Sequence, residues 1–301
     1  MFRTEHFLGP RRLVLVVGAF VAAALILVFY PRKTLFPPLP VPNGYDVFVQ
    51  FAAKITPRHT SLKEMAPNEL AGLVATNRAA LNELRRGLEL PCAVPVGIKE
   101  GWLATQVTNL ASLRAAALAM DDEAFLLTQQ GDVAGALNEC LDVLRFGQAI
   151  SKQGLLINFL VGSACEVMAV RRMTNLVTTL NAAQCRRAAI ALQEHEDQRE
   201  SLDEITQRDR EWSRRTYGFL ARIREMIEER SLELGKSFGF LDVEKEYQTR
   251  VLEVRLFMLR LAGRAFELER GRKPKRASEL VPDYLRAVPL HPQSRAPLEL
   301  P

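Results

Sequence analysis

The longest uninterrupted run of hydrophobic residues lies near the start of the chain, at 13–30 (LVLVVGAFVAAALILVFY). It has no charged residue and no proline, and Leu, Ile, Val or Phe fills twelve of its eighteen positions. On an insertion scale these residues sum to roughly −5 kcal/mol. A helix of this length spans about 27 Å, close to the hydrocarbon core of a bilayer. The pattern predicts a transmembrane signal anchor at 13–30, preceded by a short N-terminal tail at 1–12.

A cleaved signal peptide and a buried soluble helix are the alternatives to this anchor. A signal peptide has a shorter apolar core and a small-residue cleavage site, whereas this run is followed by YPRK. A buried helix of a soluble body is disfavoured, because no face of this segment is polar. Arg3, Arg11 and Arg12 outnumber the basic residues just after the run, Arg32 and Lys33. By a small margin, the positive-inside rule favours a single pass through the inner membrane, with a cytoplasmic N-terminus and the body outside.

Residues 31–42 (PRKTLFPPLPVP) hold five prolines in twelve positions. This composition predicts an extended, polyproline-rich stalk, with a segment packed on the body as the alternative. Hydrophobic residues then recur at helical spacing through most of the chain. Helices are expected at 45–55, 67–88, 98–129, 133–151, 155–180, 182–234 and 241–270, and a short one at 278–285. The predicted fold is all-α: an antiparallel multi-helix bundle or short solenoid-like body at 43–271, with a small extended C-terminal appendage at 272–301.

Four of these helices admit a second interpretation. The segment 155–180 could be another membrane span, but Glu166, Arg171 and Arg172 interrupt it. The pair 98–129 and 133–151 resembles one hairpin of a tetratricopeptide-type solenoid, yet no second copy follows at a period near 34 residues. The charges of 182–234 alternate in sign, which is typical of a solvated helix with i,i+4 ion pairs. A partner-binding surface or coiled coil is the alternative for that last segment.

Composition narrows the classes of function. The chain is 48% hydrophobic and 25% charged, as in ordinary folded proteins. Its net charge is +5, and its basic residues are interleaved with acidic ones. A nucleic-acid partner is therefore not expected. The four cysteines form no C-x-x-C pair, so we expect free, mostly buried thiols, with one disulfide as the alternative.

No motif of catalysis, cofactor binding or metal binding is present. His195 lies between Glu194 and Glu196, but sequence neighbours point away from each other on a helix, so it is expected to be a solvated surface residue. The other histidines, His6, His59 and His291, share no constellation. The sequence therefore predicts no catalytic, cofactor-binding or metal-binding residue and no cofactor. Carboxylates brought together only by folding, as in a glycosidase, are invisible to this reasoning.

The last part of the chain, FELERGRKPKRASELVPDYLRAVPLHPQSRAPL at 266–298, resembles the tail of a family of planctomycete single-pass membrane proteins. That tail is similar in turn to the C-terminal region of type II secretion pseudopilins. The stretches 42–55 and 77–96 are also similar to segments of the planctomycete family. Lys273, His291 and Arg295 depart from the family pattern, and His291 cannot supply the carboxylate that pseudopilins use for calcium. The resemblance implies no activity and no metal site.

These observations lead to three functional hypotheses. The first is a membrane-anchored, non-catalytic scaffold or protein-binding module of the cell envelope. Its expected partners are the lipid bilayer through 13–30 and one further protein. The second is an accessory component of a type II secretion-like apparatus. The third is an envelope hydrolase with dispersed carboxylates.

Overall fold

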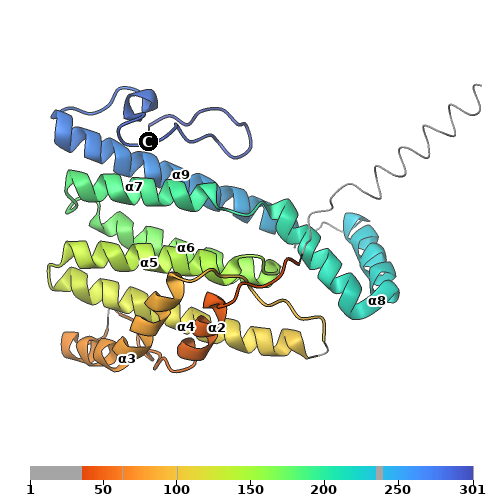
Figure 1. The fold of residues 1–301 in the computed structure, drawn as a ribbon. Helices are drawn as coiled ribbons and strands as arrows, with labels where there is room; N and C mark the ends of the chain where they lie inside the picture. Colours follow the sequence, from red (N-terminus) through yellow and green to blue (C-terminus); the bar gives the residue numbers. More distant parts are fainter. Residues whose placement is uncertain (1–35, 63, 100, 235–239, 301) are drawn as a thin grey trace, which may run out of the picture. The chain divides into compact units, whose positions relative to one another are not determined.

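The computed structural model describes residues 36–62, 64–99, 101–234 and 240–300, with side chains outside 219–242. This part of the chain contains eight α-helices, no named strand and one isolated bridge, between Leu290 and Pro297. The helices are α2 (Gly44–Ala52), α3 (Pro67–Leu88), α4 (Trp102–Gln129), α5 (Val133–Ser151), α6 (Leu156–Leu176), α7 (Ala182–Asp197), α8 (Leu202–Leu234) and α9 (Phe240–Arg270). The all-α, multi-helix prediction is confirmed for these residues (Figure 1).

The predicted anchor at 13–30, the tail at 1–12 and the first part of the stalk, 31–35, lie outside the described residues. Within the described ranges, α6 included, no helix combines the length and hydropathy that a bilayer crossing requires. The described end of the stalk, 36–42, forms neither helix nor strand. Its first residue, Phe36, packs against α8, where the Arg215 guanidinium lies 5.0 Å from the centre of the ring.

Several helix boundaries follow from local sequence signals. Pro67 occupies the first turn of α3, where its missing N–H needs no partner. The Asn181 side chain caps α7 by accepting a hydrogen bond from the backbone N–H of Gln184. In turn, the Gln184 side-chain oxygen accepts a hydrogen bond from the backbone N–H of Asn181. Gly131 ends α4 and Gly271 follows α9, both with the positive φ angles of left-handed turns. The predictions for these boundaries are confirmed.

The single helix expected at 182–234 is wrong, because the chain turns at 198–201 and forms α7 and α8 separately. Ser201 and Glu204 form a reciprocal cap at the start of α8, with Glu204 N donating to Ser201 Oγ over 3.2 Å. This S-x-x-E signal is readable in the sequence but was hidden by the surrounding charges. Helix α8 breaks again at Gly218, whose φ of 74° is outside the helical region. The short helix expected at 278–285 is only a 3-10 turn, Ala277–Leu280, which Pro282 closely follows.

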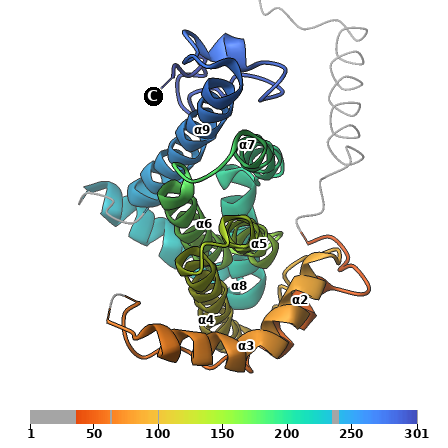
Figure 2. The ribbon, with the colours of Figure 1, turned by 90° about the vertical axis from the view of Figure 1, so that its left-hand side faces the viewer.

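Helices α4, α5 and α6 form the centre of the described body (Figures 1 and 2). Helices α2 and α3 pack against α4 and α5 on one side, and α7 and α9 pack together on the other. The closest approach is between α5 and α6, where Gly147 faces Gly162. A Cβ added at Gly147 would lie 2.7 Å from the carbonyl oxygen of Gly162. The two backbones can touch only because neither residue has a side chain.

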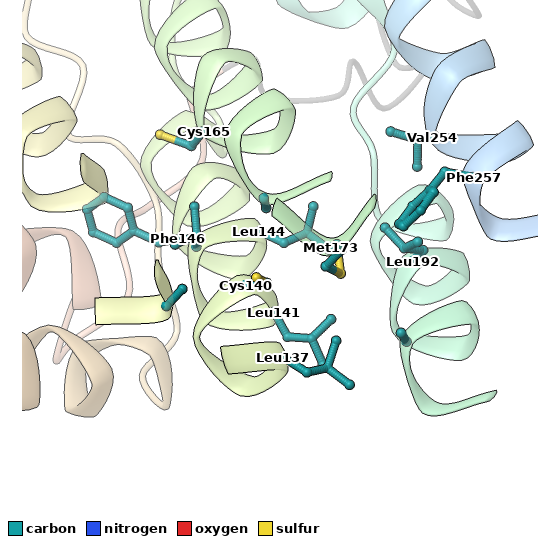
Figure 3. Close-up of a cluster of buried hydrophobic side chains, with 14 of the residues drawn as sticks. Leu137, Cys140, Leu141, Leu144, Phe146, Cys165, Met173, Leu192, Val254 and Phe257 are labelled. Carbon is teal, nitrogen blue, oxygen red and sulfur yellow. The ribbon is translucent and has the colours of Figure 1, made fainter. Parts of the chain in front are cut away.

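One continuous hydrophobic core runs through all the layers. Helix α5 contributes its inner row, Leu137, Leu141 and Leu144, and Figure 3 shows these side chains directed towards the neighbouring helices. Leu192 of α7 lies beside Phe257 of α9 in the same view. The cysteines at 140, 165 and 185 are buried in this core, and all four thiols of the chain are free. Burial raises the pKa of Cys165 to about 12, so this thiol behaves as a small apolar side chain.

Helix α4 is tied to three neighbours by three consecutive acidic residues. Asp121 accepts two hydrogen bonds from the Arg172 guanidinium of α6, at 2.7 and 2.9 Å. Asp122 pairs with Arg58 of the α2–α3 connection. Glu123 pairs over 2.5 Å with Arg85 of α3, which also reaches Glu139 of α5 at 2.6 Å. Successive side chains of a helix point about 100° apart, so three neighbouring acidic residues can form ion pairs with three different segments.

The C-terminal segment packs on the body. Leu280, Tyr284 and Leu285 are buried in the same core as the helices. The Tyr284 ring lies 5.6 Å from the ring of Phe266, and its hydroxyl donates to Glu269 over 2.8 Å. Residues 36–301 form one compact unit, so the segment after α9 is a continuation of the body's core.

Candidate functional site

A long groove lies between α5 and α7, bordered by the end of α3 on one side and α9 on the other. Its first section has a volume of about 570 Å³ and its second about 660 Å³. The two sections share Leu141, Arg145, Ala191 and Glu194, so they form one continuous depression, which we call the α5–α7 groove. Arg187 donates to Asn138 over 2.6 Å at one end, and Gln148 donates to the carbonyl of His195 over 3.1 Å at the other. Helices α5 and α7 are therefore parallel along the groove.

The lining of the α5–α7 groove combines an apolar floor with balanced charges. Leu141, Leu144 and Ala191 form apolar parts of the floor. The charged lining consists of four basic residues, Arg145, Lys152, Arg186 and Arg187, and four acidic residues, Glu89, Asp142, Glu194 and Glu269. A groove with equal numbers of both signs does not select a highly charged ligand such as a nucleic acid. It suits a ligand with apolar groups and charges of both signs.

A buried ion-pair centre lies beneath one end of the groove. Glu166 of α6 is 3% exposed and its Oε2 atom lies 2.6 Å from His195 Nε2. The same oxygen accepts from Arg199 Nη2 over 2.5 Å. Burial alone would raise the pKa of Glu166, but Arg199 and His195 outweigh burial and hold that pKa below its usual range. Glu166 is therefore a stable buried carboxylate.

The centre continues from Arg199 to α9 and the C-terminal segment. Arg199 also pairs with Glu196 over 2.6 Å, and burial of this guanidinium is outweighed by the two carboxylates, which raise the pKa of Arg199. Glu196 in turn accepts from Arg255 of α9 over 2.9 Å. Arg255 donates to the carbonyl oxygen of Leu290 over 2.6 Å. This chain of contacts joins α6, α7, α9 and the C-terminal segment.

A small cavity of about 40 Å³ adjoins the centre and shares His195, Gln148, Lys152 and Gln198 with the groove. Three buried atoms of residues that line the cavity have no hydrogen-bond partner within the protein: Ser163 Oγ, Glu166 Oε1 and His195 Nδ1. A cavity needs roughly 10–15 Å³ to hold one water molecule, so this volume suits a few water-sized molecules. The cavity can thus hold small hydrogen-bonding molecules at the floor of the groove.

The prediction that His195 is a solvated surface residue is wrong. Its side chain is 7% exposed because α7 turns this position towards Glu166, 29 residues earlier in the chain. Glu194, by contrast, is exposed at the groove rim and pairs with Arg286. The signal that the sequence offered was Glu166 itself, since a charged residue within an apolar helix requires a buried partner. His59 is exposed, and His291 only accepts two backbone N–H groups within its own turn.

The chemistry that this arrangement supports is binding and positioning. A glycosidase needs a carboxylic acid that stays protonated beside its substrate, whereas Glu166 has a lowered pKa and Glu196 is held by two arginines. Burial raises the pKa of Glu139 to about 7 and that of Asp122 to about 6, but these carboxyls pair with Arg85 and Arg58 and line neither section of the groove. Among the described residues, no three His, Cys, Asp or Glu side chains gather as metal ligands would.

The fold and groove define the molecule as an all-α, multi-helix protein with an elongated surface groove. Comparison of the chain with models of protein families, with curated proteins and with solved structures gave no match. The functional argument therefore depends on the geometry of this chain alone.

Proposed function

We propose that this chain is a membrane-anchored, non-catalytic binding protein of the cell envelope, whose body holds a short extended segment of a partner protein in the α5–α7 groove. The observation that carries the proposal is the elongated groove, which joins two sections of about 570 and 660 Å³. Along α5 it extends from Asn138 to Lys152, which is about 21 Å at 1.5 Å per residue. An extended peptide of about six residues has the same length.

A peptide suits this groove better than a compact small molecule. Its backbone can bond with polar rim residues such as Gln148 and Gln198, and alternate side chains can meet the apolar floor or the charges of either sign. The centre beneath the groove supports its shape, because Glu166, His195 and Arg199 hold α6 and α7 together where the groove ends. In this proposal the buried ion pairs are structural and the groove is the binding surface.

The anchor at 13–30 gives the proposed protein its place in the inner membrane, with the body on the outer side. A type II secretion-like accessory role remains an alternative that derives from the resemblance of the tail. The hydrolase alternative receives less support, because the buried carboxylates beside the cavity are neutralised by arginines. Protease treatment of spheroplasts, from which the outer membrane has been removed, tests the topology: digestion of the body from outside supports the proposal, and full protection contradicts it.

Site-directed photo-crosslinking tests the groove. A photoreactive amino acid at Ala191, which lines both sections, should crosslink to one recurring protein in cells. The same probe at Ala79, exposed on α3 and outside both sections, is the matched control. Ala191→Trp should fill the groove and weaken capture of that protein at least tenfold, about 1.4 kcal/mol, while Ala79→Trp should not. Equal crosslinking at both positions, or capture unaffected by Ala191→Trp, would reject the groove as the binding site.

A further inference from the structure

A cluster of aromatic side chains lies where the chain enters the described body. The rings of Trp102 and Trp212 are 5.7 Å apart, and Trp212 is also 5.7 Å from Tyr217. Three residues after Trp212, on the same side of α8, Arg215 lies over the ring of Phe36. We call Phe36, Trp102, Trp212 and Tyr217 the aromatic corner. None of these residues lines the α5–α7 groove.

The aromatic corner is built rigidly and leaves apolar surface uncovered. The indole N–H of Trp212 donates to the carbonyl of Gly97 over 2.8 Å, and that of Trp102 donates to Pro95 over 3.1 Å. Both ring positions are therefore fixed by the 95–97 loop. On the outer side, Tyr217 is 56% exposed and Ile98, next to Gly97, is 52% exposed. Large apolar side chains this exposed at one place commonly mark an interaction surface.

The charge around the corner is positive. Arg214 and Arg215 are about half exposed and share one acidic partner, Glu211. Lys99 is exposed on the adjoining loop. The excess of basic side chains would be attracted to anionic lipid headgroups. An exposed tyrosine beside arginine and lysine, here Tyr217, is typical of the membrane interface.

The length of the chain limits how far this corner can be from a bilayer. The predicted span ends at residue 30 and Phe36 begins the described body, so six residue steps separate them. Even a fully extended chain covers no more than about 22 Å over six steps. The surface that carries Phe36 must therefore stay close to the headgroup region, if the anchor is inserted.

We propose that the aromatic corner is a membrane-interfacial surface, which seats the body on anionic lipid headgroups through Tyr217, Ile98, Lys99 and the two arginines. The proposal rests on the anchor in the proposed function but is independent of the groove. It adds a second membrane contact to the anchor and fixes which face of the body meets the lipid. The groove residues then keep one orientation towards any partner in the envelope.

Tryptophan fluorescence tests this surface directly, because the two tryptophans of the chain both belong to the corner. The full-length protein is reconstituted into phosphatidylcholine–phosphatidylglycerol vesicles that contain lipids brominated either near the headgroup or deep in the acyl chain. Flotation of the vesicles first reports whether the protein is anchored. We expect loss of tryptophan emission with both lipids, larger with bromine near the headgroup.

Two variants make the result specific. Ile98→Glu combined with Tyr217→Glu should abolish most of the quenching while flotation is unchanged. Leu268→Glu, an exposed hydrophobic position on α9 outside the corner, should keep the quenching of the native protein. Flotation without quenching, or quenching that persists in the double variant, would overturn the interfacial surface and leave the anchor standing. Failure to float would overturn the anchor in the proposed function, and the interfacial surface with it.

Discussion

Gly147 of α5 and Gly162 of α6 meet backbone to backbone at the centre of the helical body. A Cβ at Gly162 would fall within 2.9 Å of the Ser151 side chain and against the carbonyl oxygen of Gly147. The nearest of these atoms is the backbone carbonyl oxygen, which cannot move aside without separating the two helices. This contact brings α6 close enough to place Glu166 under α7.

Gly162→Ala should therefore destabilise the protein although alanine is the better helix former. Overpacking costs about 1–3 kcal/mol, and the helix propensity of alanine returns up to about 1 kcal/mol, so we expect a net loss of about 1–2 kcal/mol. Urea denaturation followed by circular dichroism measures it. Gly72→Ala is the matched control, because a Cβ at that position of α3 meets no atom within 4 Å. The control should gain about 0.5–1 kcal/mol, and a loss in both variants would contradict the close contact.

Removal of the buried carboxylate at Glu166 should be more damaging. Glu166→Ala leaves Arg199 and His195 buried without this partner, and breaking a buried ion pair from one side costs about 3–5 kcal/mol. The midpoint of urea unfolding should fall accordingly. Glu194→Ala, which removes an exposed ion pair from the same region, should cost less than about 1 kcal/mol. Similar small losses in both variants would mean that the centre is more hydrated than the geometry indicates.

The stability of the protein should depend on the protonation of Glu139. Burial raises the pKa of Glu139 to about 7, and Arg85 only partly opposes this rise because it also binds Glu123. A carboxyl group with a raised pKa in the folded state favours folding when it is protonated. Its contribution is thus fully present below about pH 4.5, the ordinary glutamate pKa, and is lost as the pH rises to about 7.

Glu139→Gln should remove this dependence. The free energy of unfolding of both proteins, measured by urea titration across the same pH range, should differ in slope between pH 4.5 and 7. The native protein should lose more stability than the variant as the pH rises through this window. Parallel pH profiles would show that Glu139 ionises at its ordinary pKa.

The C-terminal segment should contribute to the stability of the whole body. Tyr284→Ala removes a ring that is 1% exposed and packed on Phe266, and we expect a loss of about 3–5 kcal/mol. Tyr284→Phe keeps the ring and removes only the hydrogen bond to Glu269, which is worth about 1–2 kcal/mol. Thermal unfolding of the two variants separates these contributions. A native-like melting temperature in Tyr284→Ala would mean that the segment is an independent appendage.

Most helices could be predicted from the sequence because their signals are local. The proline at the start of α3, the Asn181 cap of α7 and the glycines after α4 and α9 act within one helical turn. The break between α7 and α8 was also local, in the Ser201–Glu204 cap, but alternating charges obscured it. A run of charged residues forms a solvated face only when none of them has a buried partner elsewhere in the fold. Here His195 has such a partner, Glu166, which lies 29 residues earlier in the chain.

The groove could not be predicted from the sequence. Its residues come from α3, α5, α7 and α9, and no spacing along the chain relates Arg145 to Ala191. The two glycines at 147 and 162 were the nearest sequence signal, because glycine inside a helical pattern often marks close packing. The signal identifies a close contact but not its partner, which only the tertiary structure supplies.

The acidic run Asp121-Asp122-Glu123 also sets the rotation of α4 about its own axis. A turn of the helix by one residue, about 100°, would carry every one of these carboxylates away from its arginine at once. Arg172, Arg58 and Arg85 belong to three different segments, so no single rearrangement could restore all three pairs. A largely apolar helix could settle in several rotational registers with similar burial. Here the three adjacent ion pairs stabilise only one rotational register of α4.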